Sequence, residues 1–341
     1  MPQVSTFIDR TRSDGRFKGR QDIFRAIEDI SLSQNPPTWL FYGRRRTGKT
    51  STLKHLPQRI GGDLIPLFVD CQKIATSTKL TNIAKIISDA IVTTALTNRN
   101  LKLTPIDPIA LQDDPFYALQ TWIDSISAQF PDKRFLLCLD EFERLQEIIK
   151  TTNSRAPLNF LRSLMQNSKQ WILLFSGSHH LDELEPYWTD YLIGTRTLSL
   201  SYLNEPEARD LITHPIPTFP QIYDEAAITA IVHLTHRQPY LIQLVCSALI
   251  ERLNQQKRDR ITLDDVNAIV PIALERGSTY FKEFWDNLTP DQRDFLLPLS
   301  QNKPILPNPN LIHQLTQLEI LNGTTFQVPL IQTFIQMKKI E

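Results

Sequence analysis

The strongest constraint on the fold of this chain is an eight-residue run at residues 43–50 that combines two glycines with a lysine and a threonine. Its residues are Gly43, Arg44, Arg45, Arg46, Thr47, Gly48, Lys49 and Thr50. The apolar segment Trp39–Tyr42 before it has strand length, and Ser51–Leu56 can continue it as a helix. The pattern G-x-x-x-x-G-K-[ST] between a strand and a helix is the Walker A pattern, which predicts a phosphate-binding loop.

The residue types in this run suit the chemistry of phosphate binding. Glycines let successive backbone N–H groups turn inward as an anion nest, and the N-terminus of the following helix adds free N–H groups. We expect Lys49 to bind the β- and γ-phosphates of a nucleotide and the Thr50 hydroxyl to ligate Mg²⁺. Ser51, the next residue, completes the predicted nucleotide-binding loop. The alternative is a chance match within an ordinary turn.

A second apolar segment, Phe135–Leu139, ends in two carboxylates, Asp140 and Glu141. This is the Walker B form, in which we expect Asp140 to hold Mg²⁺ through a water and Glu141 to polarise an attacking water. Two acids after a strand can also open a helix, since acids are favourable at helix N-termini. The sequence contains no N-K-x-D motif for guanine, so we expect the nucleotides to be ATP and ADP.

A third apolar segment, Trp171–Phe175, is followed by Ser176-Gly177-Ser178. A hydroxyl side chain at the end of a buried strand fits a sensor of the γ-phosphate or the attacking water, and Ser176 and Ser178 compete for that role. A plain strand-to-loop turn is the alternative. His179 and His180 follow, but adjacent residues on a loop rarely converge on one metal ion, so we do not expect a metal site there.

The pattern of the first 201 residues predicts a three-layer α/β domain with a parallel sheet, because strands alternate with segments of helical periodicity around residues 83–91 and 119–126. Asn98–Pro115 is read as a surface insertion. The five predicted strands are Trp39–Tyr42, Leu64–Val69, Arg134–Leu139, Trp171–Phe175 and Arg196–Leu200.

After residue 201 the sequence predicts helices. The first begins near Pro206, and others cover Ala226–His236, Pro239–Leu253 and Leu263–Leu274, so residues 202–279 are expected to form an all-helical domain. Residues 280–341 combine helical patterns with a hairpin at Ile320–Phe326, whose turn is expected at Asn322-Gly323. Helices followed by a two-stranded wing predict a small winged-helix domain.

Composition excludes several classes of protein. Lys plus Arg and Asp plus Glu each number 37, and this balance argues against a protein whose main task is coating nucleic acid or an acidic membrane. The longest apolar runs have strand length, so we expect no membrane-spanning helix. Three widely spaced cysteines, Cys71, Cys138 and Cys246, predict buried thiols in a reducing compartment, and hence a cytoplasmic protein.

Charge is unevenly distributed along the chain. Residues 1–60 hold 12 Lys or Arg and 5 Asp or Glu, a net charge of +7, which suits a bound polyanion. Residues 281–341 hold 5 Lys or Arg and 6 Asp or Glu, a net charge of −1, which disfavours groove binding to DNA by the winged helix. We therefore expect that domain to contact protein or to act as an autoinhibitory element.

Together these motifs resemble the P-loop ATPases of the STAND and archaeal-ATPase branch, relatives of AAA+ proteins. Phe17-Lys18-Gly19-Arg20 is similar to the family's F-x-G-R entry motif, whose loop lies beside the adenine, so the resemblance implies nucleotide contacts at Gly19 and Arg20. Arg196 also lies near a family arginine that reaches the γ-phosphate, so the resemblance implies a catalytic contact there. Residues 236–243 resemble the G-x-P lid motif and imply a nucleotide contact near Pro239, although His236 replaces the expected glycine.

The resemblance implies a sheet of order 5-1-4-3-2, a helical lid, and a switch in which ADP and ATP favour different conformations or oligomeric states. Our leading hypothesis is a slow ATP-hydrolysing switch with catalytic residues Glu141 and Lys49, a protein partner or self-association, and no membrane contact. Two alternatives remain open. One is a non-hydrolysing nucleotide-dependent scaffold, and the other is an ATP-dependent DNA-handling factor.

Overall fold

The computed structural model describes residues 17–178, 185–192 and 194–338 in two compact units. Gly19–Ser201 forms the core unit, and the described residues from Tyr202 onward, together with Phe17 and Lys18, form the helical unit. Each unit has its own hydrophobic core. His179 and His180, considered above for a metal site, lie outside the described residues.

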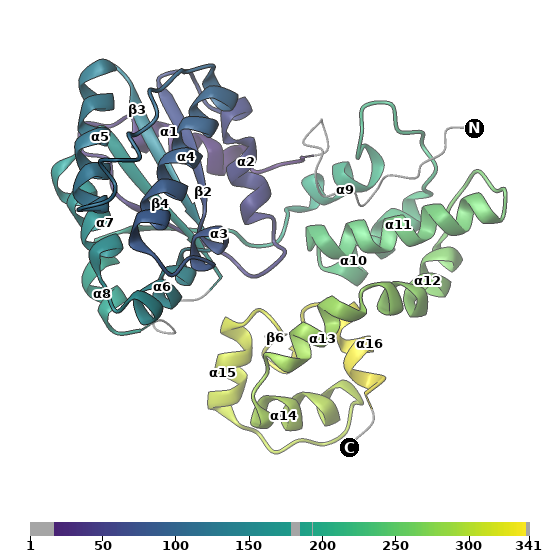
Figure 1. Ribbon diagram of the computed structural model, residues 1–341. Coiled ribbons are helices and arrows are strands. Elements are labelled where there is room, and N and C mark those ends of the chain that lie inside the picture. Colours follow the sequence, from purple (N-terminus) through teal and green to yellow (C-terminus); the bar gives the residue numbers. More distant parts are fainter. Residues whose placement is uncertain (1–16, 179–184, 193, 339–341) are drawn as a thin grey trace. The chain divides into compact units, whose positions relative to one another are not determined.

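The core unit is built on a five-stranded parallel sheet in the order β2-β3-β4-β1-β5, which confirms the expected order 5-1-4-3-2 (Figure 1). Each strand coincides with a predicted segment. Because a parallel sheet is covered on both faces, its central strands are mostly apolar, and every residue of β4 is buried. The strands are β1 (Trp39–Tyr42), β2 (Leu64–Asp70), β3 (Arg134–Asp140), β4 (Trp171–Gly177) and β5 (Arg196–Ser199).

Helices cover both faces of the sheet, as right-handed crossovers between parallel strands require (Figure 1). On one face α5 packs against both α4 and α7, whereas α1 and α2 pack together on the other. The helices of this unit are α1 (Gln21–Ser31), α2 (Lys49–Arg59), α3 (Cys71–Ala75), α4 (Leu80–Arg99), α5 (Pro115–Gln129), the 3₁₀ turn η1 (Phe142–Arg144), α6 (Leu145–Thr152), α7 (Ala156–Asn167) and α8 (Tyr187–Leu192).

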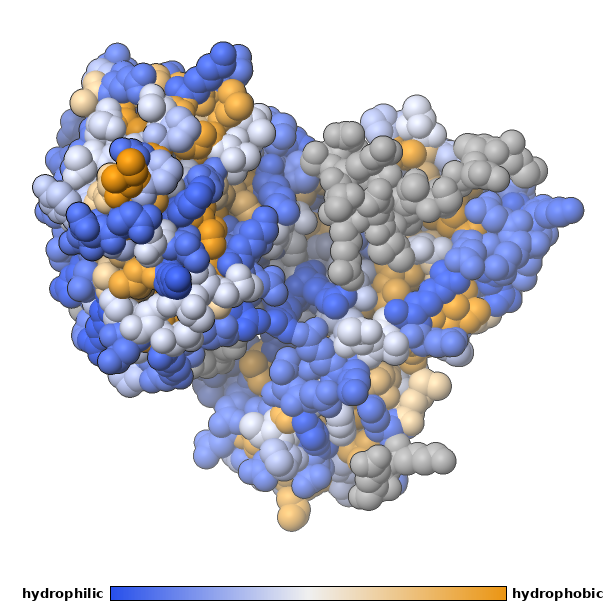
Figure 2. All heavy atoms as spheres, viewed as in Figure 1, coloured by the Kyte–Doolittle hydropathy of each residue, from blue (hydrophilic) through white to orange (hydrophobic). Residues whose placement is uncertain are grey.

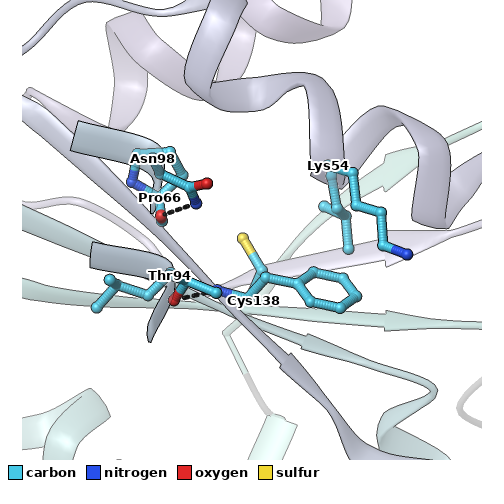
Figure 3. Close-up of a pocket in the computed structure, with 8 residues that line it drawn as sticks. Lys54, Pro66, Thr94, Asn98 and Cys138 are labelled. Carbon is cyan, nitrogen blue, oxygen red and sulfur yellow. Dashed lines mark hydrogen bonds between the residues drawn. The ribbon is translucent and has the colours of Figure 1, made fainter. Parts of the chain in front are cut away.

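Strand β2 forms one edge of the sheet. Side chains of α4 form hydrogen bonds with backbone groups on its outer side. Thr94 Oγ1 accepts a hydrogen bond from Phe68 N at 3.3 Å, and Asn98 Nδ2 donates to Pro66 O at 2.9 Å (Figure 3). Pro66 itself suits an edge strand, since it has no N–H to donate. The polar side chains of α4 therefore occupy positions that a further strand would otherwise fill.

A cavity of about 180 Å³ lies beside this edge. It is lined by Leu53, Lys54, Pro66, Leu67, Phe68, Thr94, Asn98 and Cys138, none of which is a predicted site residue, and Figure 3 shows the Cys138 sulfur pointing into it. Burial raises the pKa of that thiol well above its usual range, so it stays protonated. All three cysteines are free and buried, which confirms the prediction of buried thiols.

The helical unit contains helices and one short hairpin around a single core that runs from Leu203 to Ile335. Its division into a lid and a winged helix at about residue 280 stays a prediction. The elements are α9 (Glu205–Thr213), α10 (Glu225–Thr235), α11 (Pro239–Gln255), α12 (Leu263–Arg276), α13 (Ser278–Asp286), α14 (Pro290–Ser300), α15 (Pro309–Gln317), β6 (Leu321–Asn322), β7 (Thr325–Phe326) and α16 (Pro329–Gln336).

Local sequence explains where these helices begin. Pro206 stands in the first turn of α9, as predicted, behind an Asn204–Glu207 capping box. The hairpin forms, but its turn is displaced by one residue from the prediction. Asn322 pairs with Thr325, so Gly323 (φ 61°) and Thr324 form the turn, and the residue that takes the left-handed conformation is the glycine.

The surface view shows hydrophobic residues in small groups between hydrophilic ones on the visible face (Figure 2). Among the described residues, no helix has both the length and the apolar character needed to cross a membrane.

Candidate functional site

The phosphate loop leaves the carboxyl end of β1, and both of its glycines are required by the backbone. A Cβ on Gly43 would lie 2.7 Å from Leu200 O, and the N–H of Gly43 donates to Gly177 O at 3.3 Å. Gly48 has a φ of +100° and directly precedes α2. Glycine adopts this left-handed conformation without the penalty that a Cβ brings, so the helix N-terminus can turn toward a ligand.

Between the glycines the chain makes a tight turn. Thr47 is buried, its hydroxyl donates to Arg44 O at 2.8 Å, and its N–H donates to the same oxygen at 3.3 Å. Arg46 has a φ of 64°, a conformation that costs a non-glycine residue about 1–2 kcal/mol. Arg45 is exposed, whereas Arg44 and Arg46 are half-buried, so the loop carries three arginines in sequence next to Thr47.

Lys49, the first residue of α2, folds back over the loop. Its side chain is buried, and Nζ donates to Gly43 O at 2.6 Å and to Arg44 O at 3.0 Å. Burial lowers the pKa of Lys49, while the nearby charges of Glu141 and Asp140 oppose that shift. An ammonium group held in this way can exchange carbonyl oxygens for phosphate oxygens at little rotamer cost. Ser51, also predicted for the nucleotide site, is exposed in the first turn of α2.

Two residues that are 90 positions apart meet beside the loop. Thr50 Oγ1 donates to Asp140 Oδ2 at 2.6 Å, and Ser176 Oγ donates to Asp140 Oδ1 at 2.8 Å. Burial raises the pKa of Asp140, while these two hydrogen bonds favour its charged form and oppose the rise.

A hydroxyl and a carboxylate oxygen are hard donors that fit Mg²⁺, which takes its remaining ligands from phosphates and waters. The described residues contain no group of three or more His, Cys, Asp or Glu side chains that could hold a metal ion.

Glu141 follows Asp140 with a φ of 55°, which turns the chain sharply away from β3. Its side chain is half-buried, and burial, assisted by the charge of Glu143, raises its pKa. A carboxylate with a raised pKa is a stronger base toward water. The predicted pair of acids therefore lies at the carboxyl end of β3, next to the loop, as the topology of an open parallel sheet favours.

Glu143 belongs to this site, although sequence reasoning did not single it out. It is 8% exposed, and its Oε1 accepts hydrogen bonds from Ser178 N and Ser178 Oγ, both at 3.0 Å. The signal in the sequence was a third acid two positions after Glu141. In this arrangement the two predicted sensor hydroxyls each donate to an acid, Ser176 to Asp140 and Ser178 to Glu143, so the choice between them stays open.

The F-x-G-R segment reaches the loop through Arg20. Gly19 has a φ of 78°, and the buried Arg20 guanidinium donates to Ser201 O at 2.6 Å and, more weakly, to Thr47 O at 3.5 Å. Its observed hydrogen bonds thus include backbone carbonyls of the loop and of the segment after β5.

Arg196 is not brought to the phosphate loop. It pairs with Trp39 at the amino end of the strands, and its guanidinium lies over the Trp39 ring at 5.8 Å. Gly43 is four residues further along β1, about 13 Å away at the usual rise per strand residue. The structure therefore does not bring Arg196 to the phosphate loop, because Arg196 is the first residue of its strand and the loop follows the carboxyl ends of the strands.

Pro239 and His236 belong to the helical unit. Pro239 begins α11, as predicted, while His236 and Arg237 both have positive φ, 46° and 63°. The backbone at the expected glycine thus takes the left-handed conformation even though a side chain is present there. A nucleotide contact near Pro239 stays a prediction.

No protein-family model and no curated protein matches the sequence. Solved structures do match it. The Walker-type ATPase of Pyrococcus abyssi has a TM-score of 0.65 at 14% identity, over 97% of this chain and 100% of that one. The ORC2 protein of Aeropyrum pernix, in ADPNP–ADP complexes, has a TM-score of 0.59 at 13% identity over 97% of each chain. The ORC1 protein of Aeropyrum pernix in complex with DNA has a TM-score of 0.51 at 15% identity, over 96% of this chain and 95% of that one.

At these identities the similarity establishes the fold. The chain shares the α/β fold of these solved structures, with a five-stranded parallel sheet followed by a helical region with a small hairpin. The resemblance to the STAND branch in particular stays a prediction.

Proposed function

We propose that this chain binds ATP with Mg²⁺, hydrolyses it slowly, and uses the nucleotide state as a switch. The observation that supports this best is the contact of Thr50 with Asp140 at 2.6 Å beside the buried Lys49. A hydroxyl, a carboxylate and an ammonium group converge there at the N-terminus of α2, on a fold similar to Walker-type ATPases.

Each residue then has a distinct role. The loop backbone, the N-terminus of α2 and Lys49 bind the phosphates. Thr50 and Asp140 would hold Mg²⁺, which supplies neutralisation of the charge that develops on the phosphate oxygens. Glu141 accepts a proton from the attacking water, and its raised pKa suits it to that task.

The assignment of Glu141 can be tested by the Glu141→Gln variant. We expect it to bind ATP as the wild type does and to lower the rate of phosphate release by about 100-fold or more, because an amide cannot accept the proton. Asp124→Asn, which changes an exposed carboxylate on α5, is the matched control and should retain full turnover. Unchanged phosphate release in Glu141→Gln would overturn the assignment.

The switch part of the proposal predicts a change of state with nucleotide. Sizing the purified protein with ADP and with a non-hydrolysable ATP analogue should give different hydrodynamic radii or oligomeric states, since only ATP offers the γ-phosphate to the site. Identical behaviour with both nucleotides would remove the switch and leave an ATPase. Through this change we propose that the helical unit contacts a protein partner or a second copy of the chain.

A DNA-associated role is the second candidate function. The similarity to the ORC1 protein of Aeropyrum pernix in complex with DNA favours it, whereas the net charge of −1 over residues 281–341 disfavours it. A DNA-binding protein of this kind should lose affinity steeply with salt. A non-hydrolysing scaffold would instead bind ATP without turnover in the wild type.

A further inference from the structure

Glu143 links two strand ends that carry the candidate catalytic groups. It lies in η1, two residues after Glu141, and its Oε1 accepts hydrogen bonds from both donors of Ser178, the first residue after β4. Two hydrogen bonds from one residue to one oxygen fix the position of both partners. The turn after β3 is thereby tied to the end of β4.

The end of β4 is packed closely against η1. A Cβ on Gly177 would lie 2.5 Å from Glu143 Oε2 and 2.6 Å from the Phe142 ring, so only glycine allows β4 to approach the turn this closely. The carbonyl of Gly177 also accepts the hydrogen bond from Gly43 N, the first residue of the phosphate loop. The chain of contacts therefore runs from the turn after β3, through the end of β4, to the loop.

A third buried acid is costly in this place. Glu143 adds negative charge near Glu141, and burial of a carboxylate carries a desolvation penalty. Its charge raises the pKa of Lys49 and so favours the ammonium form of that residue. In addition, the side chain supplies an acceptor oxygen with the geometry to receive Ser178 N and Oγ together.

We propose that Glu143 is a positioning residue that clamps the end of β4 to the turn carrying Glu141 and so holds Glu141 in place for the attack of water. The catalytic part of this inference rests on the proposed ATPase function. The clamp itself acts through an oxygen acceptor. A glutamine at this position keeps that oxygen without the charge, so it should accept the same two hydrogen bonds from Ser178.

The first test compares turnover in two variants with the dissociation constant of a non-hydrolysable ATP analogue. We expect Glu143→Ala to lower kcat about 10- to 100-fold while nucleotide binding is maintained, because a small displacement of Glu141 impairs chemistry more than phosphate binding. Glu143→Gln should stay within about threefold of the wild type, since an amide oxygen accepts the same two hydrogen bonds. Glu147→Ala, which changes an exposed acid paired with Arg144 on the same segment, is the control.

The second test does not depend on turnover. Hydrogen–deuterium exchange of the Ser178 amide, followed by mass spectrometry with residue-level fragmentation, should be about 5- to 10-fold faster in Glu143→Ala than in the wild type and unchanged in Glu143→Gln. If Glu143→Ala does not fold, Ser178→Ala replaces it. It removes one donor and should lower kcat about threefold, again with nucleotide binding maintained.

The outcomes separate the two proposals. A wild type that binds ATP without turnover overturns the proposed ATPase function, and the exchange measurement then still decides whether the clamp exists. Turnover that is equally impaired in Glu143→Gln and Glu143→Ala overturns the clamp, since charge rather than acceptor geometry would then matter. Unchanged exchange at Ser178 in Glu143→Ala overturns it as well.

Discussion

The ion pair at the start of α12 makes a quantitative prediction about acid stability. Asp265 is a 10%-exposed side chain whose two oxygens accept from Arg258 Nη1 at 2.7 Å and Nη2 at 2.9 Å. Oδ2 also accepts from Thr262 N at 2.9 Å and from Thr262 Oγ1 at 3.0 Å. The bond from Arg258, with those from Thr262, lowers the pKa of Asp265 from 3.8 to about 2.

The lowered pKa of Asp265 affects the stability of the folded state. The folded state binds a proton at Asp265 less readily than the unfolded state does, so the charged form stabilises the fold by roughly 2 kcal/mol at neutral pH. That stability is present above the unfolded pKa of 3.8 and is lost as pH falls toward 2. About half of it should be lost by pH 3.

Replacing Asp265 with asparagine removes the charge and keeps the shape. At pH 7 we expect Asp265→Asn to lower the free energy of unfolding of the helical unit by about 2 kcal/mol, less whatever hydrogen bonding the amide retains. Urea denaturation followed by circular dichroism measures the difference from the wild type at pH 7, 5, 4 and 3. Asp264→Asn, at the exposed neighbour, should stay within about 0.5 kcal/mol of the wild type.

The pH dependence decides whether this reasoning holds. The difference in the free energy of unfolding between the wild type and Asp265→Asn should be constant from pH 7 to pH 5. It should become smaller below pH 4. A gap that is the same at pH 3 as at pH 7 would refute the linkage argument, because the loss would then come from packing rather than from charge.

Two further substitutions probe the core unit, both by urea denaturation. Gly177→Ala should destabilise it by about 1–3 kcal/mol because the new methyl group would overlap Glu143 and Phe142, whereas Gly62→Ala, with open space around it, is the near-neutral control. Arg99→Ala should cost about 2 kcal/mol, since the guanidinium donates to the carbonyls of Pro57, Ile60 and Gly61 at the end of α2. An equal loss of unfolding free energy in Arg59→Ala, which changes an exposed arginine of α2, would contradict that explanation.

The parts of the fold that follow from local patterns were predictable from the sequence. The segment Trp39–Tyr42 is a strand with the predicted bounds, because its apolar run is delimited by Pro37 before it and Gly43 after it. The contact of Thr50 with Asp140 also follows, since the loop after β1 and the last residue of β3 lie at the carboxyl edge of one parallel sheet.

Other features depend on contacts that no local pattern encodes. The assignment of Arg196 came from the family resemblance, whereas its position as the first residue of β5 pairs it with Trp39 at the amino end of β1. The role of Glu143 depends on Ser178, 35 residues away, and on the close approach that Gly177 permits. Similarly, nothing near Arg99 in the sequence indicates that its guanidinium donates a hydrogen bond to the carbonyl of Ile60, 39 residues earlier, at the end of α2.

The polar cover on β2 limits how copies of this chain could associate. An uncovered edge strand invites polymerisation through backbone hydrogen bonds, as in amyloid and domain-swapped assemblies. Here Thr94 accepts from Phe68 N and Asn98 donates to Pro66 O, so an incoming strand would first have to displace both. Any nucleotide-controlled assembly of this chain is therefore expected to use side-chain surfaces instead of this sheet edge.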